Sequence, residues 1–132
     1  MAWQALAGGA NGLLWYSAHH IFKCSPPDEV EMNWGNLVKV AEEVKSYADV
    51  MLSDDAAVAS LNPSVSVRAF RKDGETWVLA VNSSDRPLDA KLDLSGKFSS
   101  ATAAFGPVPQ LADGTRLSLA LKPLEPALVR MR

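Results

Sequence analysis

The sequence has one cysteine, no long apolar run and no excess of positive charge, and each shortage excludes a class of protein. Because Cys24 is the only cysteine, the chain cannot form an internal disulfide, and its fold must depend on an apolar core. No apolar run reaches the roughly 18 residues that a membrane-spanning helix needs. The first residues also lack the basic and apolar stretches of a secretory signal. We therefore expect no membrane partner.

Positive charge is scarce in the first part of the chain and dispersed in the second. Residues 1–62 carry three basic and eight acidic side chains, a net charge of −5, whereas residues 63–132 carry ten and seven, a net charge of +3. The basic residues of the second part fall on alternating strand positions, which is typical of a solvated sheet face. Since nucleic-acid surfaces need clustered Lys and Arg, we expect no nucleic-acid partner.

The first part of the chain combines helical apolar spacing with one short apolar segment. Residues 1–7 predict the end of a helix that two glycines stop. Residues 11–17 (NGLLWYS) are apolar on both faces, as in a strand buried inside a parallel sheet. A loop is expected from 18 to about 32. A second helix is expected over about 34–52, with Asn33 as its cap.

This helix–strand–helix unit cannot be a domain by itself. A single parallel strand has no neighbours for its N–H and C=O groups, and unpaired buried backbone groups are costly. We therefore interpret residues 1–62 as part of a larger protein, with its neighbouring strands encoded elsewhere.

The pattern changes at Asn62-Pro63 to short alternating strands separated by turns. We expect six strands between residues 65 and 131, with Asp73-Gly74 as one hairpin turn. So many short strands favour a sandwich of two sheets. The expected fold is therefore α+β, with the helix–strand–helix unit over 1–62 followed by an antiparallel β-sandwich over 63–132.

Two segments carry a family resemblance. Residues 3–17 (WQALAGGANGLLWYS) resemble the segment that leads into the eighth strand of the (β/α)8 barrel in β-galactosidase-like retaining glycoside hydrolases. Residues 124–130 (LEPALVR) resemble the last strand of the small C-terminal β-sandwich in those enzymes. The resemblance implies that residues 1–62 are a barrel remnant, that residues 63–132 are the C-terminal sandwich, and that the parent protein binds carbohydrate.

The resemblance also implies what the chain does not contain. Retaining enzymes of this kind use two carboxylates about 5–5.5 Å apart, one as acid/base and one as nucleophile. In the family these groups lie at the ends of the fourth and seventh strands, which would lie upstream of Met1. No residue of this chain inherits either role, so we expect the isolated chain to be inactive, and the mechanism implies no cofactor.

The mouth of such a barrel supplies the candidate substrate-binding residues. Functional side chains lie at the carboxyl ends of barrel strands, so the candidates there are Trp15, Tyr16, His19 and His20. Trp34, at the start of the second helix beside the loop, is a further candidate. Aromatic faces can stack on a sugar ring, and histidine nitrogens can bond hydroxyls. The alternative, that Trp15 and Tyr16 simply fill the core, stays open.

Other polar clusters have ordinary structural explanations. His19, His20 and Cys24 lack the further ligands that a zinc site needs, so we predict no metal site. Asp54 and Asp55 are typical of a solvated loop. Three acidic residues lead into the second helix, where the helix dipole favours them: Asp28, Glu29 and Glu31.

Three functions compete. In the first, the sandwich braces the barrel of a glycoside hydrolase. In the second, it is an independent carbohydrate-binding module, which predicts a row of exposed aromatics, although those after residue 62 occupy core-like positions: Phe70, Trp77, Phe98 and Phe105. In the third, the chain is a non-enzymatic assembly protein, because an unpaired strand and an apolar helix face would recruit another copy. We expect the isolated chain to form homo-oligomers.

Overall fold

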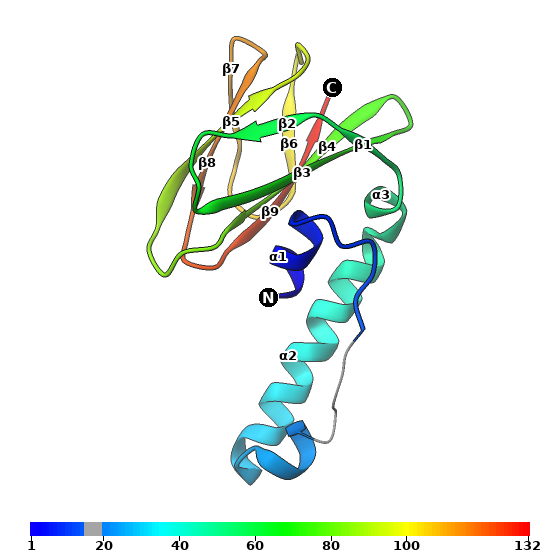
Figure 1. Ribbon diagram of the computed structural model, residues 1–132, viewed down its shortest axis with the longest axis vertical. Helices are drawn as coiled ribbons and strands as arrows, with labels where there is room; N and C mark the ends of the chain where they lie inside the picture. Colours follow the sequence, from blue (N-terminus) through cyan, green and yellow to red (C-terminus); the bar gives the residue numbers. More distant parts are fainter. Residues whose placement is uncertain (15–19) are drawn as a thin grey trace. The chain divides into compact units, whose positions relative to one another are not determined.

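The structure is a computed structural model that describes residues 1–14 and 20–132. These residues form two compact units. The sandwich unit contains Met1–Asn11 and Val50–Arg132, and the helical unit contains Gly12–Asp49. Figure 1 gives the elements, which are, in chain order, α1 (Ala2–Ala7), η1 (His20–Cys24), α2 (Pro27–Ser46), α3 (Ala48–Met51), β1 (Asp54–Ala56), β2 (Val58–Ser60), β3 (Val65–Lys72), β4 (Glu75–Asn82), β5 (Leu88–Leu94), β6 (Ala101–Phe105), β7 (Gln110–Ala112), β8 (Arg116–Leu121) and β9 (Pro126–Met131).

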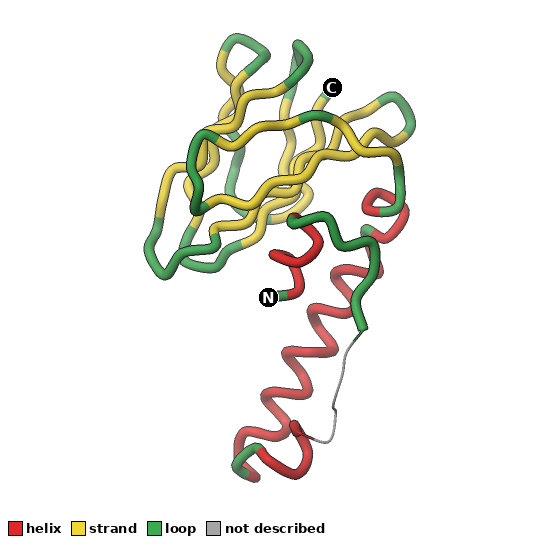
Figure 2. The backbone as a smooth tube through the Cα atoms, viewed as in Figure 1, coloured by secondary structure: helices red, strands yellow, loops and turns green. Residues whose placement is uncertain are grey.

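The sandwich unit consists of two antiparallel sheets, which confirms the expected α+β class and the β-sandwich. Sheet A has the strand order β1-β3-β4-β9-β6, and sheet B has the order β2-β5-β8-β7. The tube in Figure 2 shows these strands as layers, with the short helix α1 beside them. Alternate residues of each strand point between the sheets and form the main core. Its buried members are Val65, Ala69, Val78, Ala80, Ala90, Leu92, Leu117, Leu119, Leu121, Ala127, Val129 and Met131.

The hairpin between β3 and β4 forms where the sequence predicted it. Asp73 and Gly74 have φ angles of 52° and 78°, and two successive positive values are typical of the tight turn that matches strand twist. The turn fixes the register, so that Ala69 faces Val78 and Phe70 faces Trp77. In this register, the odd-numbered residues of β3 and the even-numbered residues of β4 lie on one face of sheet A. The other residues of both strands lie on the opposite face.

Three short strands were not expected. β1, β2 and β7 have three residues each, too few to show an alternating pattern. β1 pairs with β3 in sheet A, and β2 pairs with β5 in sheet B, so the chain changes sheets at Ala57. The sandwich consequently begins at Asp54, and the predicted seam at Asn62-Pro63 lies between two of its strands.

The helices differ from the prediction mainly at one boundary. α1 ends at Ala7, and Gly9 has a φ of 103°, which only glycine adopts easily. α2 begins at Pro27, not near Trp34, because proline fits a first helical position, where its missing N–H is not needed. Asn33 therefore lies inside α2, and the prediction that it caps the helix was wrong. Over the described residues, none of the helices combines the length and the apolar character needed to cross a membrane.

The predicted strand over 11–17 is not seen in its first part. Residues 11–14 form a bend and irregular chain, and Leu14 is 90% exposed. The remaining residues, 15–17, lie outside the described residues. Among the described strands, each pairs within the sandwich unit, so residues 11–14 have no parallel neighbour to extend.

Candidate functional site

The structure places only some of the predicted substrate-binding residues. Trp15, Tyr16 and His19 lie outside the described residues. The backbone of His20 begins η1, a π-helical turn. Trp34 lies in α2 and is 40% exposed. The five predicted residues are therefore not shown to converge, and Trp34 is the one with described side-chain geometry.

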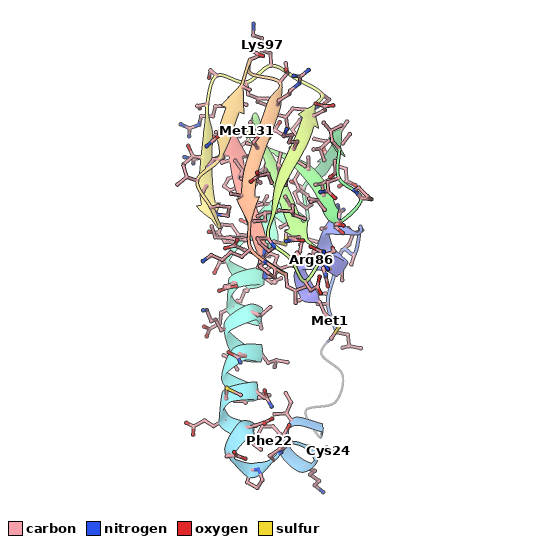
Figure 3. The ribbon with its side chains drawn as sticks, turned by 90° about the vertical axis from the view of Figure 1, so that its left-hand side faces the viewer. Met1, Phe22, Cys24, Arg86, Lys97 and Met131 are labelled. Atoms are coloured by element: carbon pink, nitrogen blue, oxygen red, sulfur yellow. The ribbon has the colours of Figure 1, made fainter. Side chains whose placement is uncertain are left out.

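Trp34 contacts an aromatic residue that was not among the predicted substrate-binding residues. The ring centroids of Phe22 and Trp34 are 5.1 Å apart, with an angle of 45° between the ring planes. Phe22 is 52% exposed, so both rings present surface to solvent. Figure 3 shows Phe22 and Cys24 together in η1, beside the beginning of α2. We call Phe22 and Trp34 the aromatic pair.

Local bonds hold the two elements of the aromatic pair together. Asn33 Nδ2 donates to Ser25 Oγ over 3.4 Å, which links α2 to the residue after η1. The backbone N–H of Glu29 donates to the carbonyl of Pro26 over 2.9 Å. η1 is a π-helical turn, which is a rare backbone conformation. The available signal for Phe22 was that no other Phe, Trp or Tyr occurs between residues 18 and 32.

A second, buried apolar face lies on the side of sheet A that points away from sheet B. Phe70, Leu79, Val81 and Leu128 occupy this side and are at most 1% exposed. We call these four residues the helix-docking face. Phe70, which the sequence placed at a core-like position, is thus buried, but outside the layer between the sheets.

The short helix α1 packs on the helix-docking face. α1 contacts β3 and β4, and its residues Trp3, Leu6 and Ala7 are buried. The Trp3 ring lies 4.9 Å from that of Phe105 in β6, measured between centroids. A helix of six residues is unstable in isolation, so this packing must supply the stability of α1.

Arg68 fixes the chain that leaves α1. Its Nη1 donates to the carbonyl of Ala10 over 3.0 Å, and its Nη2 donates to Asn11 Oδ1 over 2.8 Å. Nε donates to Asp55 Oδ1 over 2.8 Å, and the guanidinium lies 5.0 Å from the Phe70 ring centroid. The Arg68 side chain is only 12% exposed. It is therefore not one of the solvated charges that its alternating strand position suggested.

The ion pair with Arg68 gives a pH-dependent prediction. The hydrogen bond from Arg68 lowers the pKa of Asp55 below its ordinary value of 3.8, against a smaller opposing effect of desolvation. A depressed folded-state pKa contributes stability above the unfolded-state value, and this contribution disappears as the pH falls through the folded-state value. We expect Asp55→Asn to destabilise the sandwich at neutral pH and to differ little from the wild type near pH 2. Urea unfolding of both proteins at a series of pH values measures this, and an equal difference at every pH would contradict it.

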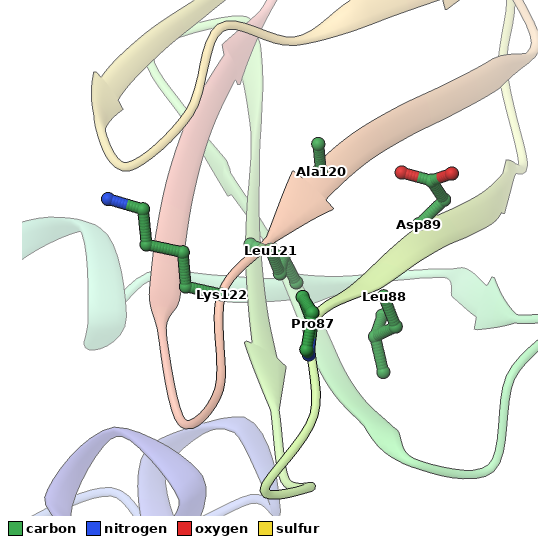
Figure 4. Close-up of a pocket in the computed structure, with 6 residues that line it drawn as sticks. All are labelled: Pro87, Leu88, Asp89, Ala120, Leu121 and Lys122. Atoms are coloured by element: carbon green, nitrogen blue, oxygen red, sulfur yellow. The ribbon is translucent and has the colours of Figure 1, made fainter.

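The exposed side of sheet B is polar and, among the described residues, carries no aromatic ring. Asp89, Lys91, Asp93, Arg116 and Gln110 are exposed on its strands, and Asp93 pairs with Arg116 at 3.8 Å. An open hollow of about 410 Å³ lies at one end of this sheet, and Figure 4 draws the residues that line it, Pro87, Leu88, Asp89, Ala120, Leu121 and Lys122. A hollow without a ring offers no stacking platform for a sugar. Trp77, on sheet A, is half-buried beneath the Arg130 guanidinium.

The described residues contain no group of three or more His, Cys, Asp or Glu side chains arranged to hold a metal ion. Cys24 is exposed as a free thiol. Asp28 and Glu29 lie in the first turn of α2, where the helix dipole stabilises acidic side chains.

Comparisons with known proteins give no family for the chain. No protein-family model matches the sequence, and no curated protein matches it.

Proposed function

We propose that this chain is the C-terminal portion of a glycoside-hydrolase-like protein, in which the β-sandwich braces the helices of a catalytic (β/α)8 barrel. The barrel would carry both catalytic carboxylates, so the chain alone would not hydrolyse glycosides. The resemblance of residues 3–17 and 124–130 to these enzymes motivates the proposal.

The observation that carries the proposal is the helix-docking face. A sandwich that works alone needs one apolar side on each sheet, but sheet A has buried apolar residues on both sides. The second side binds α1, which is the segment that would precede the last barrel strand. A sheet with this pattern is suited to holding helices of an adjoining barrel.

Two separate segments of the front part belong to the sandwich unit. Met1–Asn11 precedes the helical unit, and Val50 and Met51, both buried, follow it. The sandwich would thereby hold the chain before the last barrel strand and after the last barrel helix. Bracing both ends would fix the strand end at which Trp15, Tyr16, His19 and His20 are proposed to meet substrate.

The helical unit supports the proposal of a missing partner. None of the residues of α2, all of which are described, is buried, although the helix carries an apolar stripe that includes Leu37, Val40 and Val44. In the parent this stripe would pack on the barrel. In the isolated chain it would be free to contact another copy, and we propose self-association of the isolated chain on this ground.

A longer gene product tests the proposed function. We expect the coding sequence upstream of residue 1 to encode a barrel with two Glu residues at strand ends, and the joined product to hydrolyse aryl glycosides with retention of configuration. Residues 1–132 alone, at the same molar concentration, should not. Hydrolysis by the isolated chain, or a joined product without any barrel, would refute the proposal.

A further inference from the structure

We propose that the helix-docking face is a recognition site for Met1–Asn11, and that a second copy of the chain can supply this segment by exchange. We call Met1–Asn11 the docking segment. In an exchanged pair, each copy contributes one docking segment and one helix-docking face. The inference goes beyond the proposed function, because it depends only on contacts within the sandwich unit and needs no barrel.

The docking segment presents its buried side chains in the pattern of a helix that binds a groove. Trp3, Leu6 and Ala7 are buried, and they occupy positions i, i+3 and i+4 of α1. This spacing places them on one side of a helix, as in amphipathic peptides that dock into apolar grooves. The Trp3 ring contacts that of Phe105, and α1 contacts β3 and β4. The segment therefore has the form of a bound peptide ligand.

Arg68 binds the other end of the docking segment. Its guanidinium donates to the carbonyl of Ala10 over 3.0 Å and to Asn11 Oδ1 over 2.8 Å. Gly9, with a φ of 103°, turns the chain between the end of α1 and these two acceptors. Bonds from a charged donor are stronger than neutral ones. An aromatic contact at one end and a forked donor at the other define the direction and the position of the segment on the sheet.

The docking segment is joined to the rest of the sandwich unit through a separate unit, Gly12–Asp49. Even a short flexible linker gives a tethered ligand an effective concentration of only about millimolar order. The segments of other copies therefore compete for the face when the protein concentration approaches that value. Exchange of an identical element between copies is a low-cost route to a dimer, because the same contacts form in each copy.

The contacts favour this segment over an unrelated partner. The four residues of the helix-docking face are at most 1% exposed, so the docked segment leaves little of this face for a different ligand. When α1 leaves, these apolar side chains meet water, and a helix of six residues has little stability of its own. Docking of the same segment from a second copy removes both penalties.

The first test adds a synthetic peptide of residues 1–11 to the ¹⁵N-labelled 132-residue chain that carries Trp3→Ala. The docking segment of this host has lost its aromatic contact, so the peptide should bind and shift the backbone amide signals of β3 and β4. The same peptide with Trp3→Ala should bind at least about tenfold more weakly, the loss typical of a central aromatic anchor. Arg68→Lys in the host should weaken binding about fivefold, because an ammonium group cannot replace the forked donor.

Gly9→Ala is a second host that keeps every apolar side chain of α1. The added Cβ meets nothing within 4 Å, so only the unfavourable backbone conformation weakens docking of the host's own segment. This host should bind the peptide more tightly than the wild type does, whereas Trp34→Ala, with an intact docking segment, should match the wild type. No amide shift with millimolar peptide in either weakened host, or equal binding of the two peptides, would overturn the recognition site.

The second test is refolding at high concentration, which measures exchange between copies. The wild-type chain, refolded from urea at about 1 mM and then diluted, should contain a dimer in light scattering that Trp3→Ala does not form. An equal amount of dimer in Trp3→Ala would assign the association to α2 and overturn the exchange, as would a wild type that remains monomeric. Hydrolysis by the longer product is measured separately, so failure of the exchange and failure of the proposed function are distinguishable.

Discussion

Trp3→Ala should lower the free energy of unfolding of the sandwich unit by about 3–5 kcal/mol, the usual cost of truncating a buried tryptophan. Trp3 is 7% exposed and its ring contacts that of Phe105. The substitution would remove the largest side chain of α1 and expose part of the helix-docking face. Urea unfolding, followed by fluorescence and by far-ultraviolet circular dichroism, measures the change.

Trp34→Ala is the matched control, because the same substitution is made at a tryptophan that is 40% exposed and belongs to the other unit. We expect it to change the unfolding of the sandwich by less than about 0.5 kcal/mol. Similar losses in the two variants would show that α1 is not specifically bound to the sheet.

Asn82→Ala should lower the free energy of unfolding by about 3 kcal/mol, because it removes several bonds from one buried amide. Asn82 is 0% exposed. Its Nδ2 donates to the carbonyls of Arg86, over 2.7 Å, and Lys122, over 2.9 Å. Its Oδ1 accepts from the backbone N–H of Ser84 over 2.9 Å and from the Ser84 hydroxyl over 2.7 Å.

These bonds join the turn after β4 to the turn between β8 and β9, so the loss would affect both sheets. Asn82→Asp keeps the acceptor for Ser84 but loses both donations and introduces a charge, and we expect an equal or larger destabilisation. Gln110→Ala removes an exposed amide from β7 and should cost less than about 0.5 kcal/mol. Equal stability of Asn82→Ala and Gln110→Ala in thermal unfolding would contradict the role of Asn82.

The strands of the sandwich could be predicted where alternation extends over five or more residues. β5 is an example: Ala90 and Leu92 are buried, and Asp89, Lys91 and Asp93 are exposed. β1 was missed because it is short and begins with two aspartates, which favour loops. It pairs with β3, and its Asp55 binds Arg68 of that strand. Local sequence carries no signal for such a contact.

The two faces of sheet A could not be separated from sequence alone. Alternation places Trp77, Leu79 and Val81 on one face of β4, but it does not say whether that face meets the other sheet or a helix. Because α1 covers this face, both sides of the strand are buried. The alternation of apolar and polar residues that normally separates a buried face from an exposed one is therefore absent there. Phe22 was missed for a similar reason, since its partner Trp34 lies in a different element.

Hydrogen exchange of the backbone amides that follow α1 and bond back to it tests the bracing role most directly. The N–H groups of Gly8 and Ala10 donate to carbonyls of Gln4 and Ala5, over 2.9 and 3.0 Å, and a six-residue helix would lose these bonds unless it were held against the sheet. If the helix-docking face holds α1, these amides should exchange nearly as slowly as those of β3 and β4, and Trp3→Ala should accelerate them. Exchange at the rate of an unfolded peptide, while β3 and β4 stay protected, would contradict the bracing role.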